Sequence, residues 1–208
     1  MVFHGPAAEA GVPREVLDAL FAQAHTINTF SAEPVDPAVI AAVYEDIRWA
    51  PTQMNSQPMR LSLIHSPDAK QRLSPHMRRG NRDKTVAAPM TIIAAWDPNW
   101  HHYLNVLAPH REGAREKLEP DPAARQEIGQ RSAHLQIGYL IVGLRAHGLQ
   151  VGPMTGFNAA GVDEEFHTDT GWKTEVIINI GWKPNADDPD AVGPRAGRLS
   201  FVDACQIV

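Results

Sequence analysis

A short apolar segment in the middle of the chain limits the possible folds more than any other feature. Residues 90–95 read Met-Thr-Ile-Ile-Ala-Ala directly after the breaker Pro89. A strand that faces water on one side alternates apolar and polar residues, whereas a nearly continuous apolar strand must be covered on both faces. We therefore expect residues 90–95 to form a strand inside a layered domain, with other elements on either side.

Strand and helix signals alternate along the rest of the chain. After Pro58, residues 60–64 alternate between polar and apolar side chains, as in a strand, and residues 174–181 are rich in isoleucine. Helix starts are indicated where Asp or Ser precedes Pro, and Gly148 is a typical helix stop. We expect helices from Pro13 to about Ala24, from Pro37 until Pro51, from Pro67 to about Met77, from about Asp121 to His147, and in a short stretch toward Phe166. At least three strands flanked by helices predict a mixed layered fold; the connections leave parallel and antiparallel pairing open.

Two segments of this pattern are unusual. The second half of the long helix, residues 133–146, is apolar around most of its circumference, which predicts burial on several sides. We expect part of that surface to contact a second subunit. Residues 97–120 contain Pro, Gly, His and mixed charge without a clear period, and we interpret them as a long excursion that could act as a lid.

Length and charge exclude several classes of protein. The 208 residues suit one domain, which we place at 1–208, and we find no internal repeat. A net charge of −5 lacks the positive field that attracts nucleic acid or anionic membranes, so a bound phosphate must be held by a few local groups. The longest apolar-rich stretch, residues 135–144, is shorter than the roughly 20 residues that span a bilayer.

Cysteine content and the N-terminus predict the compartment. The one cysteine, Cys205, excludes an intramolecular disulfide, and we expect it to be a small buried side chain rather than a nucleophile. Residues 1–17 lack the basic segment followed by an apolar run that a secretory signal has. We therefore expect a cytoplasmic protein.

Two polar loops are candidates for ligand binding. The loop over residues 51–58, Pro-Thr-Gln-Met-Asn-Ser-Gln-Pro, can aim Thr52, Asn55, Ser56 and Gln57 at a ligand with donors and acceptors along its edge. In residues 152–158, Gly152 and Gly156 allow the backbone to approach a planar ligand and leave an amide exposed. Taken alone, each segment is more typical of an ordinary turn.

Arginines and histidines supply two further candidates. Arg195 and Arg198 flank Ala-Gly in an acidic tail and suit a phosphate, although two surface arginines are also ordinary. His101, His102 and His110 match no compact metal-binding spacing and have no acidic partner nearby in the sequence, so we expect no metal. Motifs for dinucleotide binding, P-loops, serine hydrolases and zinc proteases are absent from the sequence.

The order of these loops carries a family resemblance. Residues 25–30 (HTINTF), 49–58 (WAPTQMNSQP), 152–157 (GPMTGF) and 196–201 (AGRLSF) resemble the successive motifs of the nitroreductase family of FMN-dependent flavoproteins. The resemblance extends from about residue 14 to 205. Within that family, these motifs together with residues 80–89 and 135–149 look closest to the malonic semialdehyde reductase branch.

The resemblance implies a structure and a set of cofactor contacts. It implies an α+β fold with a mainly antiparallel sheet flanked by helices, in an intertwined homodimer with FMN at the subunit interface. His25, Thr26 and Asn28 would lie near the phosphate, ribityl chain and pyrimidine edge of FMN, and Arg195 and Arg198 would hold the phosphate. The other implied contacts are Pro51, Thr52, Asn55 and Gln57, of which Asn55 and Gln57 come from the partner, and Met154, Thr155 and Gly156. As the catalytic pair, Thr155 and Gly156 would present a backbone amide to flavin N5.

The resemblance also implies an activity. It implies an NAD(P)H-using oxidoreductase in which hydride passes to FMN and then, in a second step at the same place, to a small aldehyde such as malonic semialdehyde, a nitroaromatic or a quinone. Arg60, Arg82 and Lys84 are candidates for contacting a carboxylate on the acceptor. His25 and Asn28 stand where the family often has more basic residues. They motivate the alternative of a flavin- or nucleotide-binding protein without redox turnover.

Overall fold

Four antiparallel strands form the centre of the protein. The computed structural model describes residues 11–184 and 192–208, so residues 1–10, on which the expected lack of a secretory signal partly rests, lie outside the described part. The strands are β1 (Met59–Ile64), β2 (Met90–Trp96), β3 (Gln150–Met154) and β4 (Lys173–Gly181), in the spatial order β1-β2-β4-β3. Every neighbouring pair is antiparallel, which settles the question that the connections left open.

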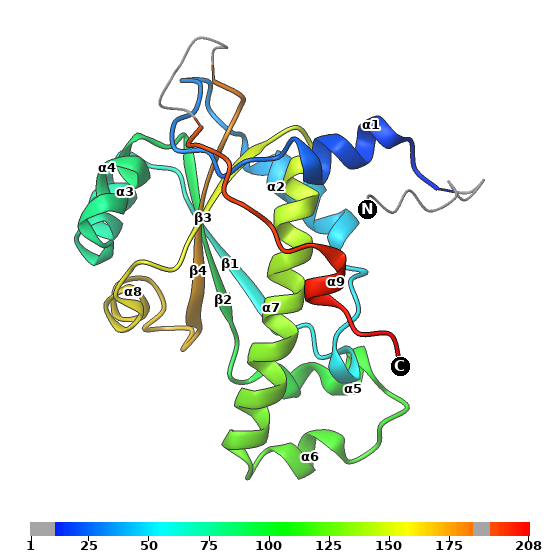
Figure 1. Ribbon diagram of the computed structural model, residues 1–208. Helices are drawn as coiled ribbons and strands as arrows, with labels where there is room; N and C mark the ends of the chain where they lie inside the picture. Colours follow the sequence, from blue (N-terminus) through cyan, green and yellow to red (C-terminus); the bar gives the residue numbers. More distant parts are fainter. Residues whose placement is uncertain (1–10, 185–191) are drawn as a thin grey trace.

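The central position of β2 confirms the expectation drawn from its apolar sequence. All seven of its residues are buried, and helices cover both faces of the sheet (Figure 1). On one face, α2 (Pro37–Ile47) and α7 (Pro122–Ala146) pack their apolar side chains against Met90, Ile92 and Ala94. On the other face, α3 (Pro67–Leu73) and α8 (Ala159–Phe166) enclose Ile93 and Ile177.

The two longest helices begin where the sequence predicts. The side chain of Asp36 accepts a hydrogen bond from the Ala38 amide at the start of α2, and Asp121 accepts one from the Ala124 amide at the start of α7. These caps satisfy amides that have no partner inside the helix. The expected burial of α7 on several sides is not met within one chain, because Leu135 and Tyr139 are about half exposed.

Three local predictions need correction. The loop expected over residues 152–158 begins as β3, because Gly152, Pro153 and Met154 pair with β4. A helix not predicted, α4 (Arg79–Ala87), follows a short 3-10 turn, η3 (Ser74–His76). Residues 97–120 are largely helical, with η4 (Trp100–Tyr103), α5 (Leu104–Leu107) and α6 (Ala114–Leu118); their proposed role as a lid stays a prediction.

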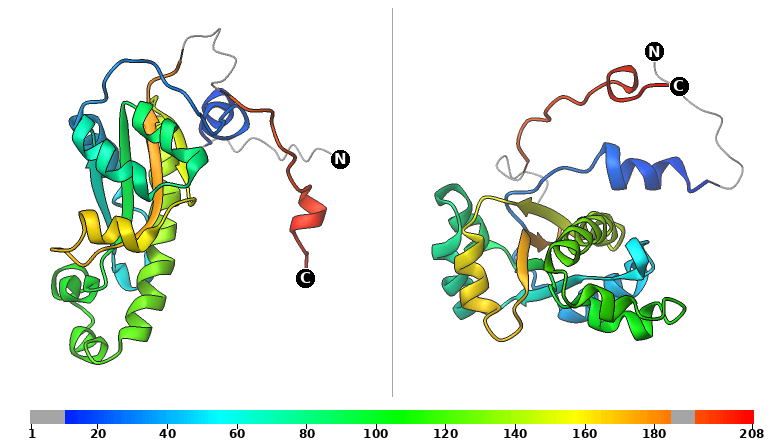
Figure 2. Two further views of the ribbon diagram at one scale, coloured as in Figure 1. Left: turned by 90° about the vertical axis from the view of Figure 1, so that its left-hand side faces the viewer. Right: turned by 90° about the horizontal axis from the view of Figure 1, so that it is seen from below.

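Two arms stand away from the sheet and its helices (Figure 2). The first is α1 (Arg14–Leu17), which continues as a π-helical turn, η1 (Asp18–Ala22), and exposes Phe21. The second is residues 192–208, exposed throughout and containing α9 (Phe201–Ala204). Cys205 lies on this arm and is exposed, so its predicted burial is wrong for the single chain. Within the described ranges, no helix has the length and apolar character needed to cross a membrane.

Candidate functional site

A pocket rich in arginine lies at one end of the sheet. Its volume is about 510 Å³, and none of the described residues that line it is acidic. The lining combines segment 24–28, the start of the C-terminal arm and the last turn of α7: Phe21, Ala24, His25, Thr26, Asn28, Arg145, Gly193, Pro194, Arg195, Ala196 and Arg198. We call it the arginine pocket. Three guanidinium groups without a carboxylate among them favour an anionic ligand, in a chain whose net charge is −5.

Hydrogen bonds inside the arginine pocket fix two of its basic side chains. Arg195 Nη2 lies 2.6 Å from His25 Nε2 and 3.4 Å from the Ala24 carbonyl. Because a guanidinium can only donate, His25 Nε2 is the acceptor of this hydrogen bond. Arg198 donates to the carbonyls of Ala196 and Gly197 at 3.1 and 2.9 Å. These contacts place the guanidinium groups of Arg195 and Arg198 at the pocket as its cationic donors.

The third arginine, Arg145, was not among the predicted site residues. It donates to the Leu20 carbonyl at 3.3 Å, and burial lowers the pKa of its guanidinium. A partly buried charge of this kind is favourable where an anion can approach it. One sequence signal pointed to it, since Arg145 is a charged residue in the otherwise apolar second half of α7.

Helix α4 joins the arginine pocket to the glycine loop after β3. Lys84 Nζ donates to Asn28 Oδ1 at 2.8 Å, and Asn81 Nδ2 donates to the Gly156 carbonyl at 3.1 Å. Asn81 and Lys84 are three residues apart and thus share one face of α4. The Arg78 amide also donates to the Gly156 carbonyl, at 2.9 Å. The helix that sequence reasoning missed thereby positions two of the predicted segments.

The loop after β3 leaves backbone donors free. Among the described residues, no hydrogen bond engages the amide of Thr155 or of Gly156. Thr155 is exposed, and Met154 and Gly156 are half-buried. A Cβ at Gly156 would lie 2.8 Å from Asn81 Nδ2, so the absence of a side chain there permits the contact with α4. The arrangement offers main-chain N–H groups to a ligand beside α4.

The segment 24–28 is held against β3. The Ile27 amide donates to the Val151 carbonyl at 3.1 Å, and Ile27 also forms an isolated bridge with Val192. Because Val151 pairs with Ile180, this segment lies at the end of the sheet where Met90 and Gly181 stand, which we call the Gly181 end. The predicted residues His25, Thr26, Asn28, Arg195 and Arg198 are therefore brought together.

The loop over residues 51–58 lies at the opposite end of the sheet. It leads into Met59, which pairs with Trp96, and Trp96 pairs with Lys173; we call this the Trp96 end. Within one chain, the structure does not bring Pro51, Thr52, Asn55 and Gln57 together with the arginine pocket. This separation agrees with the expectation that Asn55 and Gln57 act across a subunit interface, which stays a prediction.

The same loop has a strained backbone. Met54, Asn55 and Gln57 have φ angles of 60°, 54° and 42°. These angles lie in the left-handed region, which is unfavourable for residues other than glycine. Each such residue costs on the order of 1–3 kcal/mol and persists where surrounding contacts enforce it. Asn55 Nδ2 donates to the Leu107 carbonyl at 2.7 Å, and Gln57 Nε2 donates to Asn55 Oδ1 at 2.9 Å. Strain of this kind is more typical of a functional loop than of an ordinary turn.

Gln57 also borders an apolar cavity of about 560 Å³ along β1. Tyr44, Leu61, Tyr103 and Trp172 are among its lining residues. Arg60, which borders it too, pairs with Asp97 at 2.9 Å and is thus already neutralised. The other two candidates for binding a carboxylate on the acceptor differ in their contacts. Arg82 donates to the backbone carbonyls of residues 75 and 77, whereas Lys84 contacts Asn28 in the predicted site.

Titratable side chains also gather outside these regions. His101 Nε2 and His102 Nε2 lie 2.9 and 3.2 Å from Glu119 Oε2. Burial lowers the pKa of His101, and the hydrogen bond with His101 lowers the pKa of Glu119. Local sequence spacing does not reveal this acidic partner, because Glu119 lies 18 residues after His101 and 17 residues after His102. His110, in contrast, is exposed and outside the group.

Comparison with known proteins decides the family. The sequence model of the Nitroreductase family matches residues 21–182. The chain belongs to the nitroreductase family. A Leptothrix cholodnii protein with the provisional name NADH dehydrogenase/NAD(P)H nitroreductase is 41% identical over 192 residues, which are 92% of this chain and 95% of that protein. A Rhodopseudomonas palustris relative with the same provisional name is 40% identical over 197 residues, or 95% and 98% of the two chains.

The fold is that of the family. The crystal structure of a provisionally named nitroreductase from Exiguobacterium sibiricum, in complex with FMN, superimposes with a TM-score of 0.78 at 19% identity, covering 93% of this chain and 96% of that one. The α+β fold with an antiparallel sheet flanked by helices, implied by the resemblance, is thus confirmed.

Proposed function

We propose that this nitroreductase-family protein is an FMN-dependent NAD(P)H oxidoreductase that binds the FMN phosphate in the arginine pocket. The observation that carries the proposal is the convergence of Arg145, Arg195 and Arg198 on one pocket, with no carboxylate among the described residues that line it. A phosphate dianion matches this donor set, and planar guanidinium groups bind phosphate oxygens well. The FMN in the Exiguobacterium sibiricum structure and the names of the relatives support the same cofactor and reductant.

The residues beside α4 fit the flavin ring. FMN, when bound, accepts hydride from a nicotinamide and passes it to a second substrate. The free amides of Thr155 and Gly156 would donate to the ring at N5, and Asn28 would contact the pyrimidine edge. Lys84, held at 2.8 Å from Asn28, supplies there a positive charge that Asn28 itself lacks. A cation at this edge favours a ring that gains negative charge on reduction, which supports turnover over the alternative of a flavin-binding protein without it.

A homodimer would complete the site. The strained loop with Asn55 and Gln57 lies at the Trp96 end, and we propose that the partner's loop reaches the flavin bound at the Gly181 end. Apolar side chains exposed on the two arms and on α7 support such an assembly, because a soluble monomer rarely exposes so many. They include Phe21, Leu135, Tyr139, Leu199, Phe201, Val202 and Ile207.

The acceptor is assigned by chemical class. The names of the relatives favour a nitroaromatic, and a quinone suits the same two-electron chemistry. A small aldehyde such as malonic semialdehyde follows from the branch resemblance alone, and we place it behind the other two. Lys84 is the cation of this chain best placed to contact a carboxylate on such an acceptor.

Purified full-length protein tests the proposal directly. We expect a yellow protein, dimeric by light scattering, whose flavin absorbance is bleached by NADH or NADPH without oxygen and returns on adding nitroaromatic, quinone or semialdehyde. A preparation that takes up no added FMN would refute the cofactor assignment. A preparation that binds FMN but is reduced by neither nicotinamide would instead establish the flavin-binding alternative.

A further inference from the structure

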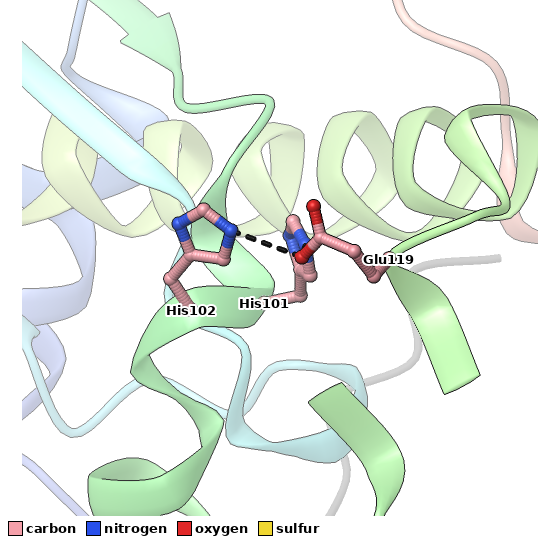
Figure 3. A group of neighbouring side chains, drawn as sticks. All are labelled: His101, His102 and Glu119. Atoms are coloured by element: carbon pink, nitrogen blue, oxygen red, sulfur yellow. Dashed lines mark hydrogen bonds and ion pairs between the residues drawn. The ribbon is translucent and has the colours of Figure 1, made fainter. Parts of the chain in front are cut away.

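We propose that His101, His102 and Glu119 form a zinc site that ties the beginning of the 97–120 segment to its end. The two imidazole Nε2 atoms and one carboxylate oxygen converge on a single point between η4 and the end of α6 (Figure 3). All three potential ligand atoms lie within 4.8 Å of one another. The site lies near Trp96 and Trp100, away from the arginine pocket at the Gly181 end, and none of its three residues is a proposed flavin contact. It also revises our sequence-based expectation that these histidines bind no metal.

The spacing of the donor atoms suits zinc. Ligand atoms about 2.0–2.2 Å from a tetrahedral zinc lie about 3.3–3.6 Å from one another. The distances to Glu119 Oε2 are 2.9 Å from His101 Nε2 and 3.2 Å from His102 Nε2. An outward movement of a few tenths of an ångström thus converts hydrogen-bond spacing into ligand spacing. Two histidines and one glutamate are a known zinc donor set, with a fourth position left for water.

The surroundings make one ligand rigid and leave two adjustable. His101 is completely buried and packs edge-on against Trp100, whose indole N–H donates to the Arg125 carbonyl at 3.0 Å. The side chains of His102 and Glu119 are 41% and 58% exposed, so they are free to adjust and an ion can enter from solvent. A fixed ligand combined with mobile ones at the surface allows binding without reorganisation of the core.

Two neighbouring groups limit the affinity. Arg125 donates to the Glu119 carbonyl, which fixes the backbone of that ligand but places a positive charge near the ion. His101 Nδ1 is buried without a hydrogen-bond partner among the described residues. Zinc would take the lone pair of Nε2, so the ring proton would move to this unsupported Nδ1. Metal ligands that lack such an outer partner bind roughly 10–100-fold more weakly, and we therefore expect exchangeable rather than permanently held zinc.

Zinc at this position would close the chain between residues 102 and 119. That loop carries α5, whose Leu107 carbonyl accepts the hydrogen bond from Asn55. Leu104, Ala108 and Leu118 of the same segment pack in one core cluster with Trp96, Trp100 and Met54. We thus expect the ion to stabilise the segment that supports the strained loop.

Zinc titration of the full-length chain, freed of any histidine tag and of FMN, tests the site. Against a chromogenic chelator, we expect one exchangeable zinc per chain, with affinity reduced about tenfold or more in His102→Ala and in Glu119→Gln. His110→Ala and Glu116→Gln are matched controls from the same segment and should keep the wild-type affinity. Pairs such as His134 with Glu175 offer only two ligands and should bind more weakly.

Thermal unfolding supplies an independent measurement. An ion that binds only the folded chain raises its melting temperature, by about 5–10 °C at 100-fold excess over the dissociation constant. We expect this rise in the wild type and in both controls, and not in His102→Ala or Glu119→Gln. Equal zinc affinity in all five proteins, or none at micromolar zinc in the wild type, would overturn the assignment and leave a hydrogen-bonded cluster only. Because FMN is absent, failure here leaves the proposed oxidoreductase function untouched.

Discussion

The two ends of the sheet are built in opposite ways. At the Gly181 end, arginines of α7 and the C-terminal arm meet segment 24–28 over a pocket, and the arm itself is exposed throughout. At the Trp96 end, a loop with three left-handed residues rests on a core cluster that contains Trp96 and Trp100. The charged groups thus lie at the Gly181 end, where packing is sparse, and the strained backbone lies at the Trp96 end, where packing is dense.

This difference indicates how the two ends contribute to one site. We expect a pocket formed by exposed arms to depend for its order on its ligand and on the partner subunit of the proposed homodimer, since little apolar burial supports it. A strained loop needs a rigid support, because otherwise its residues would relax to ordinary angles. We therefore expect substitutions at the Gly181 end to act mainly on FMN affinity, and substitutions at the Trp96 end to act mainly on stability.

The largest effect is expected for Arg198→Ala. It removes a guanidinium from the arginine pocket, and a hydrogen bond to a charged group contributes about 1.5–3 kcal/mol, so FMN affinity should fall by about 10–100-fold. The fluorescence of FMN released from dialysed protein measures the loss. Arg72→Ala, an exposed arginine on α3, and His110→Ala should retain wild-type flavin. Equal flavin content in all three variants would exclude Arg198 from phosphate binding.

Gly152→Ala should combine lower stability with weaker FMN binding. A Cβ at this position would lie 2.6 Å from the Ile27 carbonyl oxygen, so segment 24–28 would have to move off β3. Overpacking of this kind costs about 1–3 kcal/mol, measurable by urea unfolding. Gly80→Ala is the control, since no atom of the described residues lies within 4 Å of its added Cβ. An unchanged FMN affinity in Gly152→Ala would mean that this segment does not shape the pocket.

The same contact explains why β3 was missed from the sequence. Gly152 and Pro153 are typical of a turn, and only pairing with β4 and the close approach of Ile27 make them a strand. Helix α4 was missed because Arg78 offers no side-chain cap and, within the helix, only Thr85 is buried, so neither signal of a helix exists. By contrast, β2, α2 and α7 were predictable because their apolar patterns and caps are local.

The candidate site was predictable only in part for the same reason. Motif order identified His25, Asn28 and Arg198, which the fold brings to one pocket, while their contacts with FMN stay a prediction. Arg145 and Glu119 join their clusters through folding, at separations that sequence spacing cannot reveal. The function of the exposed arms is equally hard to predict, because contacts between the two chains of the proposed homodimer would leave no local pattern in the sequence of one chain.

Backbone strain at the Trp96 end can be measured with a matched pair of variants at Gln57. Both Gln57→Ala and Gln57→Gly remove the side chain, but only glycine tolerates the φ of 42°. Glycine usually destabilises relative to alanine, whereas here we expect the glycine variant to be the more stable by about 1 kcal/mol in urea unfolding. If the alanine variant is equally or more stable, the loop is not strained in solution.

The smallest effect is a pH dependence at His167, which lies between the sheet and α8. His167 is almost completely buried, with Nε2 3.0 Å from Ser62 Oγ and Nδ1 3.4 Å from Thr174 Oγ1 and 3.7 Å from Asp163. Burial lowers its pKa, an effect that Asp163 partly opposes and Lys173 reinforces. As pH falls through about 6.5, the unfolded chain therefore takes up the proton before the folded one, and stability that is full above that pH declines.

Substitution of His167 isolates its contribution to the pH dependence of stability from that of the other histidines. One proton changes the free energy of unfolding by at most about 1.4 kcal/mol per pH unit, and the change is confined to the interval between the folded and unfolded pKa values. Urea unfolding between pH 7.5 and 5.5 should therefore show a shallower loss in His167→Gln than in the wild type, whereas the exposed control His110→Gln should follow the wild type. Parallel profiles for the wild type and both variants would mean that His167 takes up its proton equally in the folded and unfolded chain. Its burial beneath α8 would then not lower its pKa.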